Sequence, residues 1–340
     1  MKNAQATIRD LAIKLNLSVS TISRALRDHP DIKPETKKAV LELARELNYE
    51  PNHVAQSLRI KKTNTLGVIV PEIAMQFFSS TLSGLQEYAS AHGYTVMICQ
   101  SMESSNIEKF NIHSLVSNQV DGLLISLSSD TKNVDHLQHL VEKNFPILLF
   151  DRVCDELNVS KVVVDDHDAA FNAIEYVIKT GCRHIAFLGG PQNLRISEQR
   201  ERGYLDALTQ SSIPIDEDLV IHCRDWHTDP IKAVQQFLTS REIPDAIFCL
   251  NDPIALLVMQ VLKKEQVRIP EEISLVGFTN EPISGLTEPS LTTVSQPSYE
   301  MGKTAARLFI DQLERPESYT PTTTVLPTQF IIRNSTRKLA

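Results

Sequence analysis

From residue 65 onward, short continuous runs of apolar residues alternate with longer segments of mixed polarity. The apolar runs predict strands at 66–70, 94–99, 121–126 and 146–150, and a second series at 162–165, 183–188, 245–250 and 273–278. Helices are expected between the first strands, around 80–92, 107–117 and 134–143. Strands that are apolar throughout are buried on both faces, as in parallel sheets covered by helices. The pattern therefore predicts an α/β fold with two doubly wound parallel sheets of similar size and a cleft between them.

The composition is that of a folded protein rather than a disordered or membrane-spanning one. Its 340 residues are 42% hydrophobic and 22% charged, which suits two or three domains. The apolar runs are far shorter than the roughly 18–20 residues of a transmembrane helix. The first ten residues, MKNAQATIRD, lack the apolar core of a signal peptide, so we expect a cytoplasmic protein. The five scattered cysteines have no metal-binding or redox spacing, so we expect reduced thiols and no bound metal.

Charge is distributed unevenly along the chain. Residues 1–62 carry 12 Lys and Arg against 7 Asp and Glu, a balance of +5. The remainder carries 22 against 35, a balance of −13, so the whole chain has a formal net charge of −8. A small basic segment joined to a large acidic one is typical of a nucleic-acid-binding head on a soluble body. A lysine-rich solvated surface would give the same numbers, so charge alone leaves both interpretations open.

The basic segment predicts three short helices. Thr7 and Asp10 have the spacing of a capping box, and apolar residues follow at helical spacing up to Leu15. Ser18 can cap a second helix from about 19 to 26, whose outer face carries small polar residues and two arginines. Pro34 suits the first position of a third helix. Two short helices joined by a tight turn are typical of a helix-turn-helix, although a plain three-helix bundle fits the spacing equally well.

Residue identities distinguish these two interpretations. The segments 6–12 (ATIRDLA), 18–26 (SVSTISRAL), 48–52 (NYEPN) and 54–59 (VAQSLR) closely resemble the headpiece of the lac/gal repressor family of bacterial transcription regulators. The resemblance implies a DNA-binding headpiece at 1–50 whose second helix enters the major groove, where Arg24 could donate two hydrogen bonds to guanine. Before the third helix, the family usually has a capping residue where this chain has Lys33. The implied DNA-contacting residues are Thr7, Ser18, Val19, Ser20, Thr21, Ser23, Arg24, Asn52, His53, Ala55 and Leu58.

Residues 51–62 correspond to the hinge helix and linker of that family. The segment 52–59 has a helical composition but only about two turns, and so short a helix is unstable alone in water. In the family it folds when two subunits bring their copies together over the minor groove. By resemblance, Val54 would face its copy in the other subunit, and Leu58 would wedge between base pairs and kink the duplex. A plain linker is the alternative.

The remainder, 63–340, resembles the two-lobed effector-binding and dimerisation core of the same family, which is itself similar to periplasmic binding proteins. The matching pieces are 121–124, 149–152, 189–191, 200, 203–204, 251–252, 276–278, 291–294 and 330–335. The resemblance implies three crossings between the lobes, with lobe 1 at about 63–162 and 295–323 and lobe 2 at about 163–294 and 324–338. Only five residues follow Ser335, too few for a tetramerising helix, so we expect a homodimer.

The resemblance also implies a set of effector-binding residues, namely Phe77, Phe78, Asp151, Arg200, Trp226, Asn251 and Thr279. Aromatic faces can stack on a sugar or base ring, and charged and amide groups can hydrogen-bond to hydroxyls. Taken alone, Trp226 would fit a core residue, Arg200 a surface ion pair and Asp151 a helix cap. Thr279 departs from the family, which usually has Asp there. Without that carboxylate the identity of a sugar stays open, and an anionic or phosphorylated ligand would suit Arg200 if no Asp lies near it.

The sequence therefore predicts a sequence-specific DNA-binding transcriptional regulator, with repression as the expected sense. Its partners would be a palindromic double-stranded operator, a second copy of the chain and a small sugar-like effector that controls operator affinity from the cleft. A phosphoprotein partner in place of the effector is one alternative, and a cytoplasmic solute-binding protein is another. The sequence has no Gly-rich phosphate loop, metal-spaced His/Cys set or nucleophile elbow, so we expect no enzyme, no catalytic residue and no cofactor.

Overall fold

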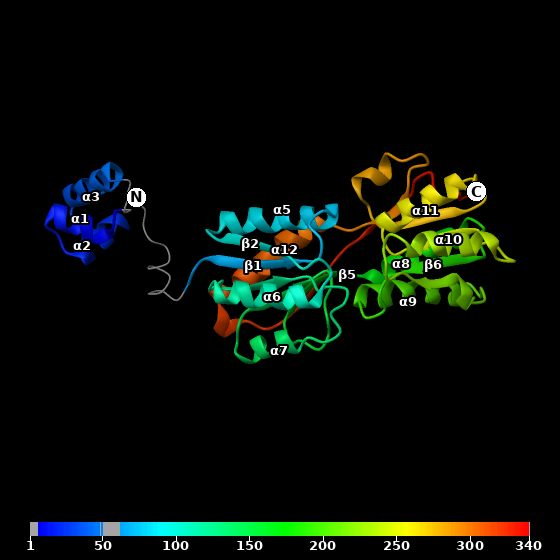
Figure 1. The fold of residues 1–340 in the computed structure, drawn as a ribbon, viewed down its shortest axis with the longest axis horizontal. Coiled ribbons are helices and arrows are strands. Elements are labelled where there is room, and N and C mark those ends of the chain that lie inside the picture. Colours follow the sequence, from blue (N-terminus) through cyan, green and yellow to red (C-terminus); the bar gives the residue numbers. More distant parts are fainter. Residues whose placement is uncertain (1–5, 48, 50–61, 340) are drawn as a thin grey trace. The chain divides into compact units, whose positions relative to one another are not determined.

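The computed structural model describes residues 6–47, 49 and 62–339, and Figure 1 shows the course of the chain. The chain divides into two compact units, Met1–Thr63 and Asn64–Ala340. Four predicted DNA contacts lie outside the described residues, namely Asn52, His53, Ala55 and Leu58. Val54, the predicted contact between hinge helices, lies outside them as well. Among the described residues, no helix is both long enough and apolar enough to cross a membrane.

The described part of the first unit contains the three predicted helices, α1 (Ile8–Leu15), α2 (Val19–Leu26) and α3 (Pro34–Glu46). The Thr7 N–H donates to the Asp10 carboxylate at 2.7 Å and the Asp10 N–H donates to the Thr7 Oγ1 at 3.3 Å, which confirms the predicted capping box. Asn16 ends α1 in the left-handed conformation, which asparagine tolerates (φ 51°). Lys33 gives α3 no side-chain cap. The buried core is formed by Leu11, Ala12, Ile22, Ala25, Val40 and Ala44.

The second unit contains two six-stranded sheets, each of which forms a lobe with the helices that cover it. The sheet of lobe 1 has the order β11-β5-β4-β3-β1-β2, and the sheet of lobe 2 has the order β12-β10-β9-β8-β6-β7. The strands of lobe 1 are β1 (Thr65–Val70), β2 (Thr95–Gln100), β3 (Gly122–Ile125), β4 (Ile147–Phe150), β5 (Ser160–Val164) and β11 (Thr323–Leu326). The strands of lobe 2 are β6 (Ile185–Gly189), β7 (Val220–His222), β8 (Ala246–Cys249), β9 (Ser274–Thr279), β10 (Thr292–Ser295) and β12 (Gln329–Ile331). Within the described residues, β10 and β12 pair antiparallel and the other pairs are parallel.

Helices cover both faces of each sheet, as the doubly wound prediction requires (Figure 1). In lobe 1, one face is covered by α5 (Gln76–Ala91) and α12 (Ser298–Glu314), and the other by α6 (Ser105–Ser117) and α7 (Asp135–Glu142). In lobe 2, one face is covered by α8 (Asp166–Lys179) and α9 (Arg195–Gln210), and the other by α10 (Asp229–Thr239) and α11 (Asp252–Lys264). Gly302 lets α12 lie close against α5, because a Cβ at this position would collide with the Thr81 carbonyl. Short 3-10 helices occur at Glu217–Leu219, Pro282–Gly285 and Pro316–Ser318.

Two strands lie in a different lobe from the one that the sequence predicts. The expected bounds place 163–294 and 324–338 in lobe 2, but β5 and β11, which end at Val164 and Leu326, pair with each other in the sheet of lobe 1. Lobe 1 therefore extends to Val164 and again to Leu326. A fully buried parallel strand such as β5 is apolar in either sheet, so its residues do not indicate which sheet it joins. The sequence does not predict strand β7, because its three half-buried residues give no periodic signal. Within the matching segment 330–335, the last strand, β12, ends at Ile331.

Candidate functional site

Hydroxyl groups gather at the start of α2. The Ser18 Oγ accepts a hydrogen bond from the Thr21 N–H at 3.1 Å, which caps the helix. The same oxygen lies 2.7 Å from the Ser20 Oγ and 2.8 Å from the Thr21 Oγ1. All three side chains are at least partly exposed. The start of a helix attracts phosphate groups, and these hydroxyls can donate to phosphate oxygens.

The outer face of α2 continues with the predicted base contacts. Val19 is 42% exposed, and Arg24 is exposed with no hydrogen bond or ion pair to its guanidinium in the described part of the chain. Arg27, in contrast, donates to the Ser23 Oγ at 2.6 Å. The Thr7 hydroxyl donates to the Asp10 carboxylate at 2.8 Å, so it takes part in the cap of α1. Arg24 can therefore reach a base edge without first breaking an intramolecular contact.

The seven predicted effector residues all line one cavity of about 30 Å³ between the lobes. Phe77 and Phe78 come from α5 and Asp151 from the end of β4, so these three belong to lobe 1. Lobe 2 supplies Arg200, Trp226, Asn251 and Thr279. This space has room for about two water molecules. A cavity of about 480 Å³ adjoins it and shares Met75, Arg152, Trp226 and Asn251, so the two together form a continuous cleft.

Arg200 is buried, and each of its three guanidinium nitrogens has a partner. Its Nε and Nη2 each lie 2.8 Å from the Asp166 Oδ1, and its Nη1 donates to the Leu250 carbonyl at 2.5 Å. Its guanidinium carbon lies 3.6 Å from the centre of the Phe278 ring. An anionic ligand is expected to suit Arg200 if no Asp lies near it, and Asp166 shows that this condition is not met. Asp166 is 34 positions away in the sequence, and only the packing of α8 against α9 brings it to Arg200. Because Asp166 balances the charge of Arg200, the argument for an anionic ligand loses its basis.

Asp151 lies across the cleft from this pair, in a left-handed backbone conformation (φ 57°). Burial raises its pKa to about 6, although the nearby Arg152 and Arg200 guanidinium groups oppose the shift. The Ser126 hydroxyl donates to its carboxylate at 3.5 Å, the limit of a hydrogen bond. Burial also raises the pKa of Asp166, and Arg200 opposes that shift. Asp151 is thus a buried carboxylate with unused acceptor capacity that faces the cavity.

Thr279 ends β9 with φ of 123°, a conformation that residues with a Cβ rarely adopt. Its Oγ1 is buried and has no hydrogen-bond partner among the residues that the structure describes. A buried hydroxyl without a partner costs free energy, and the strained backbone adds to that cost. Asn251, in turn, uses its Oδ1 to accept the Ile254 N–H at 3.0 Å and so caps α11. The cap holds the Asn251 side chain at the wall of the cavity.

Sequence analysis did not identify several cleft residues that the structure brings to the same place. The Arg152 Nε and the Gln296 Nε2 are buried N–H donors that find no partner within 6–47, 49 and 62–339, and both residues line the small cavity. The Ser197 Oγ is likewise buried and unpaired. A Cβ on Gly190 would lie 3.0 Å from this oxygen and 3.2 Å from the Trp226 ring, so this glycine preserves the space beside them. Arg152 follows Asp151 directly and could have been found from that position, whereas Gln296 has no sequence signal.

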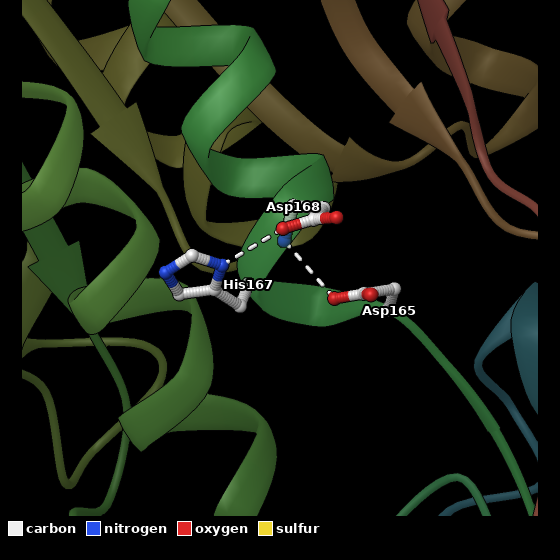
Figure 2. A group of neighbouring side chains, drawn as sticks. All are labelled: Asp165, His167 and Asp168. Atoms are coloured by element: carbon white, nitrogen blue, oxygen red, sulfur yellow. Dashed lines mark hydrogen bonds and ion pairs between the residues drawn. The ribbon is translucent and has the colours of Figure 1, made fainter.

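One further cluster of titratable groups lies at the start of α8, outside the cleft lining. Figure 2 shows Asp165, His167 and Asp168, which are close enough together to hold a metal ion. The Asp165 carboxylate accepts the Asp168 N–H at 3.0 Å and caps the helix. The His167 ring lies 3.0 Å from the Asp168 carboxylate and 2.9 Å from that of Asp206, and hydrogen bonds to Asp206 and Asp168 raise its pKa. Helix capping and ion pairing account for this arrangement.

Comparisons with known proteins agree with both halves of the structure. Residues 63–334 match the family model described as periplasmic binding proteins and sugar binding domain of LacI family, and residues 7–52 match bacterial regulatory proteins, lacI family. Catabolite control protein A of Priestia megaterium is 31% identical over 332 residues, which covers 97% of this chain and 99% of the relative. The HTH-type transcriptional repressor CytR of Escherichia coli strain K12 is 31% identical over 336 residues, which covers 98% and 97%.

Two solved structures extend the likeness to the fold. A lac repressor dimer bound to operator and the anti-inducer ONPF has 25% identity and a TM-score of 0.86, with 98% of this chain and 100% of that chain covered. A complex of the transcriptional regulator CelR with cellobiose has 28% identity and a TM-score of 0.74, with 97% and 99% covered. The chain therefore belongs to the lacI family of bacterial regulatory proteins and is a DNA-binding transcriptional regulator.

Proposed function

We propose that this regulator represses transcription as a homodimer on a palindromic operator, and that a small uncharged polyhydroxylated effector in the interlobe cleft sets its operator affinity. The observation that carries the proposal is the convergence of seven predicted residues on one cavity that also contains unpaired buried polar atoms. Buried polar atoms without a partner destabilise a fold. A ligand that supplies their partners explains why they are there.

The DNA-binding half of the proposal rests on α2. Val19, Ser20 and Arg24 would contact bases, and Ser18, Thr21 and Ser23 would contact phosphates together with Thr7. Exposed hydroxyls at the helix start and an unpaired guanidinium on its outer face support these roles. By resemblance, Asn52, His53, Ala55 and Leu58 would complete the contacts from the hinge helix.

The ligand half rests on the chemistry of the cleft. Trp226 offers a flat apolar face, and Met75, Pro253, Leu256 and Ile283 make the adjoining wall apolar. The Arg152 Nε and Gln296 Nε2 can donate hydrogen bonds, and the Asp151 carboxylate can accept them. A ring with several hydroxyl groups satisfies both kinds of partner.

The charges in the cleft favour an uncharged ligand. Glu72, Glu103 and Glu281 line the larger cavity, where Arg152 is the one Lys or Arg among the lining residues. Arg200 in the smaller cavity is balanced by Asp166. An added phosphate would meet this excess of carboxylates at close range. The complex of the related CelR with cellobiose is consistent with an uncharged sugar.

We assign the chain no catalytic role, no cofactor and no metal ion. Its relatives are named as transcriptional repressors and control proteins, and its cleft residues have a ligand-binding explanation. We place its action in the bacterial cytoplasm, where the DNA lies.

The proposal can be tested by a ligand screen on the full-length chain. Cellobiose, ribose, other neutral sugars and their phosphates are added singly, and the thermal unfolding midpoint and the fluorescence of Trp226, the one tryptophan, are recorded. We expect a neutral sugar to raise the midpoint and change the fluorescence, and its phosphate to do neither. If phosphorylated sugars alone bind, the charge argument is wrong, and if no sugar binds, the proposed ligand class is wrong.

A further inference from the structure

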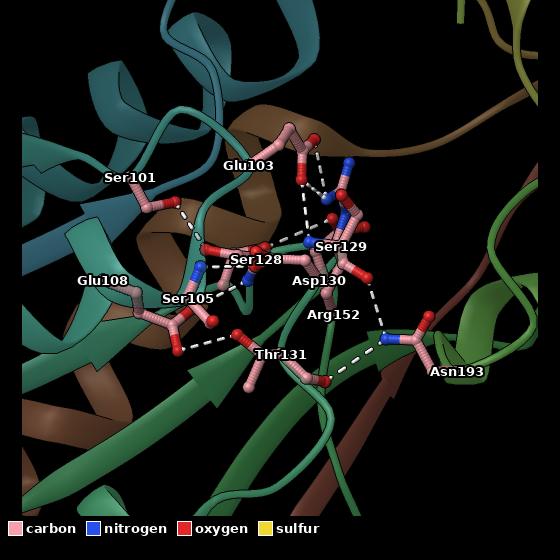
Figure 3. A network of polar contacts seen from close by, with 12 residues as sticks. Ser101, Glu103, Ser105, Glu108, Ser128, Ser129, Asp130, Thr131, Arg152 and Asn193 are labelled. Carbon is pink, nitrogen blue, oxygen red and sulfur yellow. Dashed lines mark hydrogen bonds and ion pairs between the residues drawn. The ribbon is translucent and has the colours of Figure 1, made fainter. Parts of the chain in front are cut away.

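Arg152 lies at the junction of the cleft and a polar network that spans both lobes (Figure 3). Its Nη1 donates to both carboxylate oxygens of Glu103, at 2.8 and 2.7 Å. Its Nε, by contrast, is buried and has no partner in the described part of the chain, and the residue lines both cavities. One side of the guanidinium is therefore fixed by Glu103, and the other side is left for a ligand.

The network continues from Glu103 into the opposite lobe. The Ser129 N–H donates to the Glu103 Oε2 at 2.8 Å. The Ser129 carbonyl in turn accepts a hydrogen bond from the Asn193 amide at 2.8 Å, and the Thr131 carbonyl accepts a second one from it at 3.2 Å. Asn193 lies in the turn between β6 and α9 of lobe 2, whereas its two acceptors lie between β3 and α7 of lobe 1. A continuous series of hydrogen bonds thus joins the cleft guanidinium to a contact between the lobes.

The backbone at Glu103 is held in an unusual conformation. Met102 and Glu103 both have positive φ, 52° and 56°, although neither is glycine. Residues with a Cβ are strained in this conformation, so the pair persists only where the surroundings compensate. The contact between the Glu103 carboxylate and Arg152 offsets this strain. Burial by itself would raise the Glu103 pKa, but the attraction of the guanidinium outweighs burial and lowers it.

The loop that carries Ser129 and Thr131 is fixed on its other side. Glu108 is fully buried, and its carboxylate accepts hydrogen bonds from the Ser128 N–H at 2.7 Å and from the Thr131 hydroxyl at 3.0 Å. The loop therefore cannot follow Asn193 freely when the lobes separate. Separation of the lobes must break the Asn193 contacts rather than bend the loop.

We propose that Glu103 is a positioning residue and Asn193 an interlobe latch, so that the orientation of Arg152 toward the ligand and the closure of the lobes form one coupled equilibrium. This inference rests on the proposed ligand cleft. A ligand that hydrogen-bonds to the Arg152 Nε favours the orientation that Glu103 holds. The same orientation keeps Ser129 in place for Asn193, so cleft occupancy stabilises the closed arrangement.

The test uses the full-length chain without ligand and measures quenching of Trp226 fluorescence by acrylamide. Trp226 belongs to lobe 2 and lines the cleft, so its accessibility reports how open the lobes are. The variants are Asn193→Ala and Glu103→Gln, which keeps the length of the side chain but removes its charge. Asn118→Ala is the matched control, because the Asn118 amide donates only locally, to the Ser114 carbonyl within α6.

We expect Asn193→Ala to shift the lobes toward the open arrangement by about two- to tenfold, the range for lost hydrogen bonds, and so to raise the quenching constant. Glu103→Gln should raise it as well, although residue 103 belongs to lobe 1 and Trp226 to lobe 2. In the double variant the second substitution should add less than it does alone, because both act through Ser129. Asn118→Ala should leave quenching unchanged.

Two results would overturn the inference. Unchanged quenching in Asn193→Ala would mean that the latch does not hold the lobes. A change in the unfolding midpoint of Glu103→Gln without any change in quenching would make Glu103 a local structural residue. The assay requires neither DNA nor effector, so its failure would remove the latch and leave the proposed function in place. Failure of the sugar screen would remove the proposed ligand class and leave the quenching result unaffected.

Discussion

The Arg200 Nε and Nη2 both lie 2.8 Å from the Asp166 Oδ1, and both side chains are almost fully buried. The pair fixes the guanidinium against the Phe278 ring at the wall of the cleft. Arg200 therefore has two roles at once. It supports the packing of α8 against α9, and it presents a charged edge to the cavity.

Removal of either partner of this ion pair should destabilise the core. Asp166→Ala leaves a buried guanidinium without its carboxylate, and we expect a loss of about 3–5 kcal/mol in the free energy of unfolding. Arg200→Met together with Asp166→Ala should be closer to the wild type than Asp166→Ala alone, because no unpaired charge remains. Urea unfolding followed by Trp226 fluorescence measures both. Equal losses in the single and double variants would show that the pair contributes packing alone.

Arg24 should provide base specificity in the headpiece. Arg24→Ala is expected to weaken binding to the selected operator by about 1–3 kcal/mol and to relax the preference at one base pair per half-site. Arg45→Ala is the control, because Arg45 is an exposed arginine in the last turn of α3 and has no predicted DNA contact. Fluorescence anisotropy with cognate and random duplexes separates the possibilities. An equal loss of affinity on both duplexes would make Arg24 a phosphate contact.

Asp151 should make the stability of the core depend on pH. Its pKa is about 6 in the folded chain, against the usual 3.8 of an exposed aspartate, so the folded state binds the proton more tightly. This contribution is fully present below pH 4 and is lost as the pH rises through 6, a difference of about 3 kcal/mol. Asp151→Asn should flatten the fall in the free energy of unfolding between pH 4 and 7.

The matched control for this experiment is Glu265→Gln, since Glu265 is exposed at the end of α11. Urea unfolding at each pH provides the free energies. A wild-type slope that persists in Asp151→Asn would assign the titration to another group, such as Asp166.

Thr279 should lower the stability of the folded core and strengthen ligand binding. Thr279→Gly removes the strain of a φ of 123° and also the buried hydroxyl that lacks a partner, so we expect a net gain of about 1 kcal/mol in stability. The same variant should bind the sugar identified in the screen more weakly. Thr279→Ser, which keeps the hydroxyl, should retain most of the affinity. If Thr279→Gly binds as tightly as the wild type, the hydroxyl has no role toward the ligand.

Local sequence patterns predicted the parts of this structure that depend on neighbours in the chain. The capping box at Thr7 and the cap at Ser18 follow from side chains three residues apart, and both are present. The family resemblance, which rests on residue identities, predicted seven cleft residues. Packing brings all seven to one cavity.

Features that depend on tertiary contact could not be predicted. The Asp166–Arg200 pair joins two helices that are distant in the sequence. The left-handed conformation of Glu103 is explained by its contact with Arg152, which is 49 positions away. The sheet that β5 joins follows from the course of the chain and not from the composition of the strand. No sequence motif indicates that Gln296 lines the cleft, because its place there depends on the position of β10, which it follows.

A ligand in the cleft should change operator affinity. The direct measurement is the dissociation constant of the full-length chain for its selected operator, by anisotropy, with and without a saturating amount of the sugar found in the screen. We predict a change of about 5- to 150-fold, and the operator should change the affinity for the sugar by the same factor. An operator affinity that stays the same while Trp226 fluorescence shows the cleft to be saturated would contradict the account.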